Sequence, residues 1–166
     1  MDLKQHVRDV PDFPRAGILF RDIAPLLRHH FEAVADALSA LLTGSQWGQV
    51  DAIAGIESRG FILAAALALR HGKGFVPIRK QGKLPPPVVC APYALEYGAG
   101  VLEMQPGAGR LVIVDDVLAT GGTLAASANL AAEAGYTVTE LLVLIDLRLA
   151  TDFRWRELSV RSALCY

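Results

Sequence analysis

The sequence has few cysteines, no apolar run long enough to span a membrane, and almost no net charge. Cys90 and Cys165 are its only cysteines, and they have no CxxC spacing and no histidine at ligand spacing. This argues against a disulfide framework or a zinc site. The longest uncharged apolar run, residues 61–69, is far shorter than the roughly 20 residues of a membrane span, and the N-terminus lacks a signal-peptide core. We therefore expect a cytoplasmic protein.

The charge balance also limits the partners of the protein. The formal net charge is −1 over 166 residues, and no run of like charges occurs. Neither nucleic acid nor an anionic membrane is therefore indicated as a partner. Any site for an anion must be local.

The sequence instead alternates strand-like and helix-like segments. This alternation predicts an α/β fold with a central, mostly parallel sheet flanked by helices. At this length a single domain covering residues 1–166 is expected. Helices are predicted over residues 30–43 with Gly44 as C-terminal cap, 58–71 ended by Gly72, and 123–134, and strands over residues 51–56, 74–79, 111–114 and 138–147.

Two segments interrupt the alternation. In residues 11–25, three prolines and Gly17 prevent a long helix, and the apolar residues 18–20 form a small cluster. Residues 81–106 contain a Lys-Leu-Pro-Pro-Pro tract and a strand-like segment at residues 101–104, which predicts a β-hairpin arm outside the main sheet. Long loops of this kind often act as lids, so we expect a flexible lid here.

The most informative string is LVIVDDVLATGGT, residues 111–123. A buried strand leads into two carboxylates and a small-residue loop at the start of a helix, where free N–H groups and the helix dipole bind phosphate. The loop lacks the Gly-Lys-Ser/Thr ending of nucleoside triphosphate loops, so it suits a single phosphate. The alternative is a capped turn with solvated acids. We expect a ribose 5-phosphate here: Gly121 and Gly122 let the backbone approach its phosphate, Thr120 and Thr123 can add hydroxyl donors, and Asp115 and Asp116 would accept its hydroxyls.

A second turn of this kind, GIESRG at residues 55–60, can face the same crevice. Ligands of doubly wound sheets bind at the carboxyl ends of strands, so this turn can hold a second anionic group. Arg59 offers a bidentate fork for it. The alternative interpretation is that Ser58 is a helix N-cap and that Glu57 and Arg59 form a surface pair.

Three further features have both a functional and a structural interpretation. Arg79, Lys80 and Lys83 suit a diphosphate or form a solvated basic edge. Glu96, in the string Tyr-Ala-Leu-Glu-Tyr-Gly, can stabilise positive charge or manage a proton under a closed lid, or it is an ordinary strand acid. Phe20 can stack on a planar heterocycle, with the backbone of Leu19 and Arg21 reading its edge, or it fills the core.

Together these strings resemble the type I phosphoribosyltransferases. The matching strings are PDFPRAGILFRDIAPLL, GIESRGF, FVPIRKQGKLP, LEYG and VIVDDVLATGGT, in the order of that family and over most of residues 11–123. The first string and LEYG favour the members that use adenine. The sequence departs from the family at Pro92, where a hydroxyl residue usually precedes the tyrosine, and in the triple proline of residues 85–87. Both departures concern the closing geometry of the arm.

The resemblance implies a purine salvage enzyme that transfers ribose 5-phosphate from phosphoribosyl diphosphate to N9 of adenine, giving AMP and diphosphate. It implies Mg²⁺ bound mainly through substrate, with no assigned protein ligand, and a homodimer. Residues 1–28 would form a hood over the base. The residues implied for the base are Leu19, Phe20 and Arg21; those for ribose are Asp115 and Asp116; those for the 5-phosphate are residues 119–123; those for diphosphate are Glu57, Ser58, Arg59, Arg79, Lys80 and Lys83; and Glu96 and Tyr97 would close over the site in catalysis.

Three alternatives remain open at this stage. Another purine base, hypoxanthine, guanine or xanthine, would need only a few different hydrogen bonds. A non-enzymatic sensor of phosphoribosyl diphosphate would need a DNA-binding element, and the sequence contains no helix-turn-helix or basic face. A phosphoacceptor receiver domain would have its acid pair near the start of the chain, whereas this pair follows two-thirds of it.

Overall fold

The centre of the molecule is an eight-stranded sheet with the strand order β5-β6-β4-β3-β7-β8-β10-β9. This computed structural model describes residues 1–95 and 98–166. The five neighbouring strands from β4 to β10 run parallel, and the two edges of the sheet are antiparallel. The strands are β3 (Ala52–Ile56), β4 (Gly74–Lys80), β5 (Val89–Leu95), β6 (Gly98–Met104), β7 (Gly109–Leu118), β8 (Tyr136–Asp146), β9 (Arg154–Trp155) and β10 (Leu158–Cys165).

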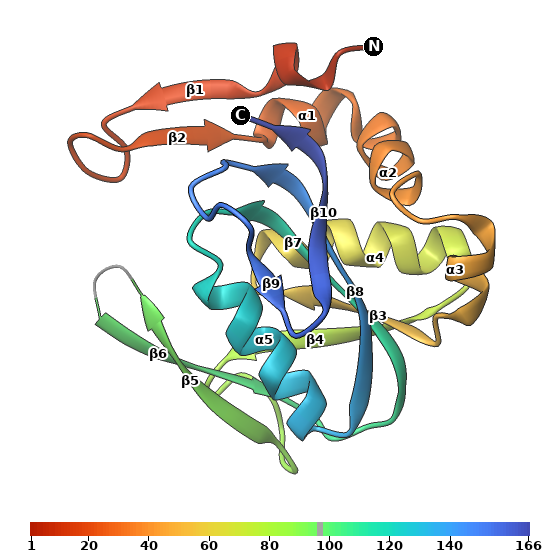
Figure 1. Cartoon of the computed structure of the whole chain (residues 1–166). Helices are drawn as coiled ribbons and strands as arrows, with labels where there is room; N and C mark the ends of the chain where they lie inside the picture. The colour runs from red at the N-terminus through yellow and green to blue at the C-terminus, as the bar shows by residue number, and fades with distance from the viewer. Residues whose placement is uncertain (96–97) are drawn as a thin grey trace.

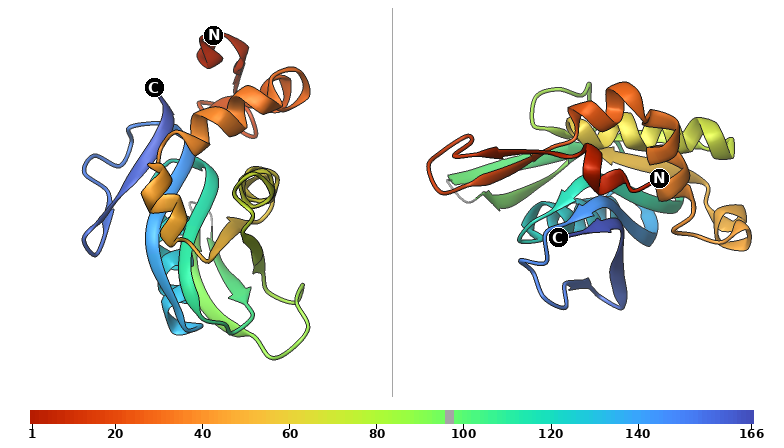
Figure 2. Two further views of the ribbon diagram at one scale, coloured as in Figure 1. Left: turned by 90° about the vertical axis from the view of Figure 1, so that its right-hand side faces the viewer. Right: turned by 90° about the horizontal axis from the view of Figure 1, so that it is seen from above.

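Helices cover both faces of this sheet (Figures 1 and 2). On one face, α2 (Phe31–Ser39) and α4 (Arg59–His71) pack against Val112 and Val114 of β7. On the other face, α5 (Gly122–Glu133) packs against Leu111 and Ile113 of the same strand. Strand β7 is therefore buried on both sides, as its continuous β-branched run predicts.

The chain begins with a small substructure that stands apart from the main sheet. The 3-10 helix η1 (Leu3–His6) leads into β1 (Arg8–Pro11), which pairs antiparallel with β2 (Leu19–Asp22), and α1 (Ala24–His29) follows. Figure 1 shows this hairpin above the carboxyl ends of β7 and β10. The hood predicted for residues 1–28 thus covers the edge of the sheet where parallel strands end.

The α/β architecture is as predicted, but three local expectations are wrong. The helix expected over residues 30–43 ends at Ser39. Gly44 does not cap that helix: it begins α3 (Gly44–Gln49), because Thr43 and Gln46 form a capping box. The hairpin arm of β5 and β6 is not outside the sheet, since β6 pairs with the end of β4 at Arg79 and Lys80.

The sequence patterns also left the end of the chain undescribed. Strands β9 and β10 extend the sheet beyond β8, and β10 pairs parallel to β8. Within the described parts of the chain, no helix is both long and apolar enough to cross a membrane.

Candidate active site

A cavity of about 670 Å³ lies between the N-terminal hairpin and the carboxyl ends of the sheet strands. We refer to it as the hood cavity. Its wall combines residues that the sequence places far apart, from the hairpin, from the turn before α4 and from the end of β7. Six of the predicted site residues line it: Leu19, Phe20, Arg21, Arg59, Asp116 and Ala119.

Asp116 is the most buried charged side chain of the hood cavity. It is 7% exposed, and its Oδ2 atom is fully enclosed. Arg59 Nε lies 2.6 Å from that oxygen as an ion-pair partner, but no donor is placed along a hydrogen-bonding direction. The Arg59 guanidinium therefore balances the charge of Asp116, whose carboxylate lines the hood cavity as an acceptor for a ligand hydroxyl.

The neighbouring Asp115 lies in an environment that disfavours its ionised form. Burial, together with the neighbouring Asp116 carboxylate, raises the pKa of Asp115 well above its ordinary value of 3.8, although the Asp116 N–H donates to its Oδ1 at 2.9 Å. The start of α4 lies directly against this residue. A side-chain carbon added to Gly60 would lie 2.8 Å from the Val114 carbonyl oxygen and 3.1 Å from Asp115 Oδ1. Close packing of α4 on β7 therefore holds the two carboxylates in place.

The predicted phosphate loop lies at the N-terminus of α5, as its sequence indicates. Gly121 is the N-cap of this helix with φ +88°, and no side chain caps the helix. A side chain at Gly121 would also meet the Phe153 ring, 2.3 Å away. The uncapped first turn offers its N–H groups to an anion. Ala119 lies on the wall of the hood cavity, while Thr120 and Gly122 are exposed and Thr123 is half-buried.

The remaining cations gather at the neighbouring strand ends, outside the hood cavity. Glu57 accepts from the Lys80 N–H at 2.9 Å and pairs with Arg79, whose Nε lies 3.3 Å away. Partial burial raises the pKa of Glu57, but these hydrogen bonds and charges outweigh it and leave the pKa lowered. Glu57 thus holds Arg79 in place. Ser58 occupies the N-cap position of α4, but its side chain makes no capping hydrogen bond.

Glu103 on β6 is a buried acid that the sequence patterns did not reveal. It is 2% exposed and accepts the N–H groups of Lys83 and Leu84, each at 2.7 Å. The hydrogen bond from the Gly82 N–H is the largest of the effects that lower the pKa of Glu103. An ionised Glu103 therefore shapes the turn that carries Lys83. Only the alternation of side-chain directions along this strand of the arm could have suggested that Glu103 is buried.

Phe20 lines the hood cavity and does not belong to either hydrophobic cluster of the described residues. This argues against the core interpretation of Phe20. Its ring packs edge-on against Phe13, with centroids 5.1 Å apart, and the Arg59 guanidinium lies 5.1 Å from its centre. Arg59 thus connects the predicted base residue with the predicted ribose residue.

The opposite wall of the hood cavity comes from the end of the chain, and sequence reasoning missed it. Leu147, Leu149 and Tyr166 line it. No local motif marks these residues, because they follow strands β8 and β10 and reach the cavity only through the sheet topology. The apolar Leu147 and Leu149 suit a planar ring held against Phe20.

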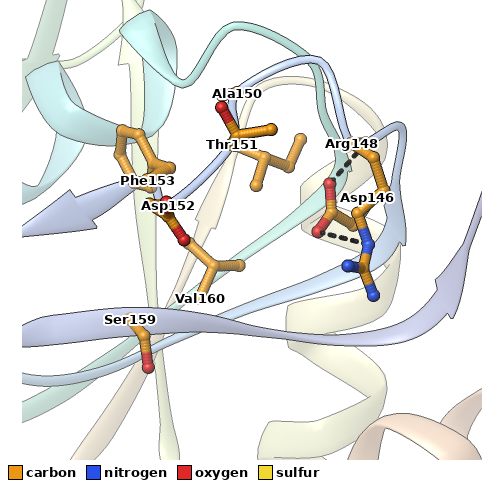
Figure 3. A pocket seen from close by; sticks show the side chains of 9 residues that line it. Asp146, Arg148, Ala150, Thr151, Asp152, Phe153, Ser159 and Val160 are labelled. Carbon is orange, nitrogen blue, oxygen red and sulfur yellow. Dashed lines mark hydrogen bonds and ion pairs between the residues drawn. The ribbon is translucent and has the colours of Figure 1, made fainter.

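The same segment borders a second, smaller cavity of about 330 Å³ (Figure 3). Leu147 and Leu149 line the hood cavity, whereas Arg148 and Ala150 line the smaller one. Asp146 accepts the Arg148 N–H at 2.8 Å and faces its guanidinium. Of the predicted site residues that the structure describes, none lies on the wall of the smaller cavity.

The two residues predicted for catalysis, Glu96 and Tyr97, lie outside the described residues. Among the residues that are described, no three His, Cys, Asp or Glu side chains form a group that could hold a metal ion.

The chain is similar to known proteins over most of its length. The family model for the phosphoribosyl transferase domain matches residues 26–162. An adenine phosphoribosyltransferase of Bdellovibrio bacteriovorus is 52% identical over 166 residues, covering 100% of both chains. The crystal structure of adenine phosphoribosyltransferase from Thermoanaerobacter pseudethanolicus superposes with a TM-score of 0.87 at 39% identity, covering 99% of this chain and 98% of the other.

A second solved structure contains ligands. It is the adenine phosphoribosyltransferase from Saccharomyces cerevisiae in complex with an imino-altritol bisphosphate and adenine. The TM-score is 0.89 at 36% identity, covering 98% of this chain and 96% of the other.

Proposed function

Since the chain belongs to the phosphoribosyl transferase family, and within it to the adenine phosphoribosyltransferases, we propose how its residues share the reaction. The enzyme transfers ribose 5-phosphate from phosphoribosyl diphosphate to adenine and forms AMP and diphosphate, a step of purine salvage. The roles of the individual side chains are the subject of the proposal.

The buried carboxylate of Asp116 is the observation that carries the assignment of the sugar. It lies on the wall of the hood cavity, which Ala119 and Phe20 also line, and Arg59 pairs with its Oδ2 atom. Asp116 would accept one ribose hydroxyl, and Asp115 would accept the neighbouring hydroxyl. The uncapped N-terminus of α5, with Ala119, Thr120, Gly121, Gly122 and Thr123, would then hold the 5-phosphate.

The cations at the ends of β3 and β4 are proposed to hold the leaving diphosphate. Loss of diphosphate from C1 leaves an oxocarbenium-like centre, so the site must stabilise the leaving group and exclude water. Arg59, Arg79, Lys80 and Lys83 supply positive charge, and Ser58 supplies a hydroxyl that is not used in capping. Glu57 contributes by orienting Arg79 and the Lys80 backbone.

Magnesium is the proposed cofactor. The described carboxylates provide no metal group of their own, so Asp115 and Asp116 would act on the ion through the ribose oxygens that they hold. When bound, Mg²⁺ neutralises charge on the diphosphate as it leaves.

The base is proposed to lie between Phe20 and the Leu147–Leu149 wall. The Phe20 ring faces the hood cavity, and the backbone of Leu19 and Arg21 borders the same space, which suits recognition of the edge of adenine. Glu96 and Tyr97 keep the role that the family resemblance gives them, closing over the site from the arm.

We further propose a cytoplasmic homodimer with no nucleic-acid or membrane partner. A charged sugar diphosphate does not cross membranes unaided, which supports a cytoplasmic enzyme. Ile62 and Leu69 lie seven residues apart on α4 and are 44% and 87% exposed, and Phe75, whose ring packs against Phe61 of the same helix, is 40% exposed. Such an apolar surface suits a second copy of the chain. Light scattering would detect this dimer.

Substitution of Asp116 by Asn tests the assignment of the ribose. We expect the KM for phosphoribosyl diphosphate to rise about 10- to 100-fold, because a charge-assisted hydrogen bond is weakened, with the dissociation constant for adenine nearly unchanged. Steady-state kinetics and calorimetry with each ligand measure the two effects. Asp36→Asn on the exposed face of α2 is the control, and equal losses for both ligands would contradict the assignment.

A further inference from the structure

We propose that Tyr166 is a positioning residue for the base, acting through its aromatic ring on Arg21. This inference rests on the proposed assignment of the base to β2. Tyr166 lies outside every matching string of the sequence, but it lines the hood cavity together with Phe20 and Arg21. Its ring, held by the sheet, fixes the strand that is proposed to recognise adenine.

The ring of Tyr166 attracts cations of the N-terminal substructure. The Arg21 guanidinium lies 4.2 Å from the ring centre, and Lys4 Nζ lies 5.1 Å from it. Both distances are within the range of cation–π attraction. Arg21 also pairs with Asp9 across the hairpin, so the guanidinium links β1, β2 and the ring.

The sheet holds Tyr166 itself in place. Its N–H donates to the Asp146 carbonyl at 2.9 Å, continuing the pairing of β10 with β8 at Cys165 and Asp146. Figure 3 shows that the Asp146 side chain is bound in turn by Arg148. The ring also packs against the hydrophobic cluster that contains α2 and α4. The ring is thus a fixed platform, and the hairpin rests on it.

The ring of Tyr166 attracts Arg21, whereas its hydroxyl group takes no part in this contact. The hydroxyl oxygen is enclosed and finds no hydrogen-bond partner among the described residues, and burial raises the pKa of Tyr166. A group without a partner does not position Arg21. The attraction for Arg21 comes from the face of the ring, which phenylalanine also has.

Two substitutions at this position test the proposal. Tyr166→Leu keeps an apolar side chain but removes the aromatic face, and we expect the KM for adenine to rise about fivefold. The kcat and the KM for phosphoribosyl diphosphate should stay within about 1.5-fold, since the ring acts on Arg21 and the hairpin rather than on the acids and the loop proposed for ribose and phosphate. Tyr166→Phe should restore the wild-type KM for adenine. Phe20→Ala, measured in parallel, should raise the KM for adenine independently.

Each result has a distinct meaning. If Tyr166→Leu leaves the KM for adenine unchanged while Phe20→Ala raises it, the role of Tyr166 is wrong and the base assignment stands. If neither variant changes it, the base assignment itself is wrong. If Tyr166→Phe behaves like Tyr166→Leu, the hydroxyl and not the ring is required, which overturns the proposal. Equal rises in both KM values would show a general structural defect and overturn it too.

A double-mutant cycle provides a second measurement, which isolates the coupling between the ring of Tyr166 and Arg21. Arg21→Met keeps the length of the side chain and removes its charge. If the ring acts through Arg21, the double variant should raise the KM for adenine no more than the larger single effect. A KM for adenine that rises in the double variant by the product of the two single effects would contradict the proposal.

Discussion

The two halves of the hood cavity are built in different ways. The sugar-phosphate half, residues 55–60 and 115–123, consists of the ends of the buried strands β3 and β7 with the turns that follow them, and the two segments pack against each other at close range. The base half, residues 17–21, Leu147, Leu149 and Tyr166, brings together the beginning and the end of the chain, where Arg21 lies against the ring of Tyr166. Close packing within short segments leaves a motif in the sequence, whereas contacts between distant segments do not.

The largest expected effect comes from alanine at Gly121 compared with alanine at Gly17. Both glycines have a similar φ, +88° and +83°, but a Cβ at Gly121 would lie 2.3 Å from the Phe153 ring, whereas at Gly17 nothing lies within 4 Å. We expect Gly121→Ala to lower kcat/KM for phosphoribosyl diphosphate by about 100-fold, because the phosphate loop must move. Gly17→Ala should change the KM for adenine by less than about threefold, the effect of backbone strain alone.

Steady-state kinetics with both substrates measures this pair of variants. Thermal unfolding of both proteins shows whether each fold persists. Similar losses in the two variants would mean that backbone strain, not the close packing of the phosphate loop, sets the difference between the two halves.

An intermediate effect concerns two acids whose pKa values shift in opposite directions. The raised pKa of Asp115 means that the folded protein keeps a proton that the unfolded chain releases above about pH 4, so this group lowers stability as pH rises through that window. Asp115→Asn should therefore raise Tm relative to wild type by roughly 3 °C at pH 8 and by almost nothing at pH 4. The same variant should weaken binding of phosphoribosyl diphosphate.

Asp22 in the hairpin provides the contrast. The Ala24 N–H lowers the pKa of Asp22; partial burial opposes this, and Arg8 adds to it. Asp22 therefore stabilises the fold above about pH 4, and its contribution is lost as pH falls through the lowered value. Asp22→Asn should lower Tm by roughly 1–3 °C between pH 5 and 8. Calorimetric scans at several pH values give both differences, and shifts of the same sign in the two variants would contradict the contrast.

The smallest effect is expected for Arg8, whose ion pair with Asp22 lies at the surface of the hairpin. Arg8 Nη2 is 2.6 Å from Asp22 Oδ2, but the Arg8 side chain is 68% exposed. Exposed pairs contribute about 0–1 kcal/mol and weaken with salt. Arg8→Ala should therefore change Tm by about 2 °C or less and the KM for adenine by less than about twofold. A loss of adenine binding comparable to that of Tyr166→Leu would show that the hairpin depends on its surface charges.

Much of the fold and of the sugar-phosphate half could be predicted from the sequence. The apolar run of β7 and the glycine after α4 identify a strand and a helix end by local rules. Asp116 and the loop before α5 follow one another within a few residues, so one string contains both the ribose and the phosphate residues that we propose. The capping box of Thr43 and Gln46 could also have been predicted from the sequence. It would have placed Gly44 at the start of a helix rather than at the end of one.

The base half could be predicted only in part. Phe20 was found through family resemblance, but Leu147, Leu149 and Tyr166 were not, because their apolar or aromatic character is equally typical of any core strand. Their role depends on β10 pairing beside β8, which brings Tyr166 to Asp146 and the hairpin. Likewise, the ion pair between Arg59 and Asp116 joins two motifs 57 residues apart, which neither motif reveals alone.

The contact between Arg21 and Tyr166 also has a consequence for synthesis on the ribosome. The two carboxylates lie on β7, which pairs with β3 and β8, and these strands emerge in sequence; the phosphate loop then packs against Phe153, which follows β8. The hairpin emerges first, but the ring on which it rests is made about 145 residues later. During translation the nascent enzyme can therefore form its sugar-phosphate half before its base half. The hairpin reaches its final position only after β10 has formed.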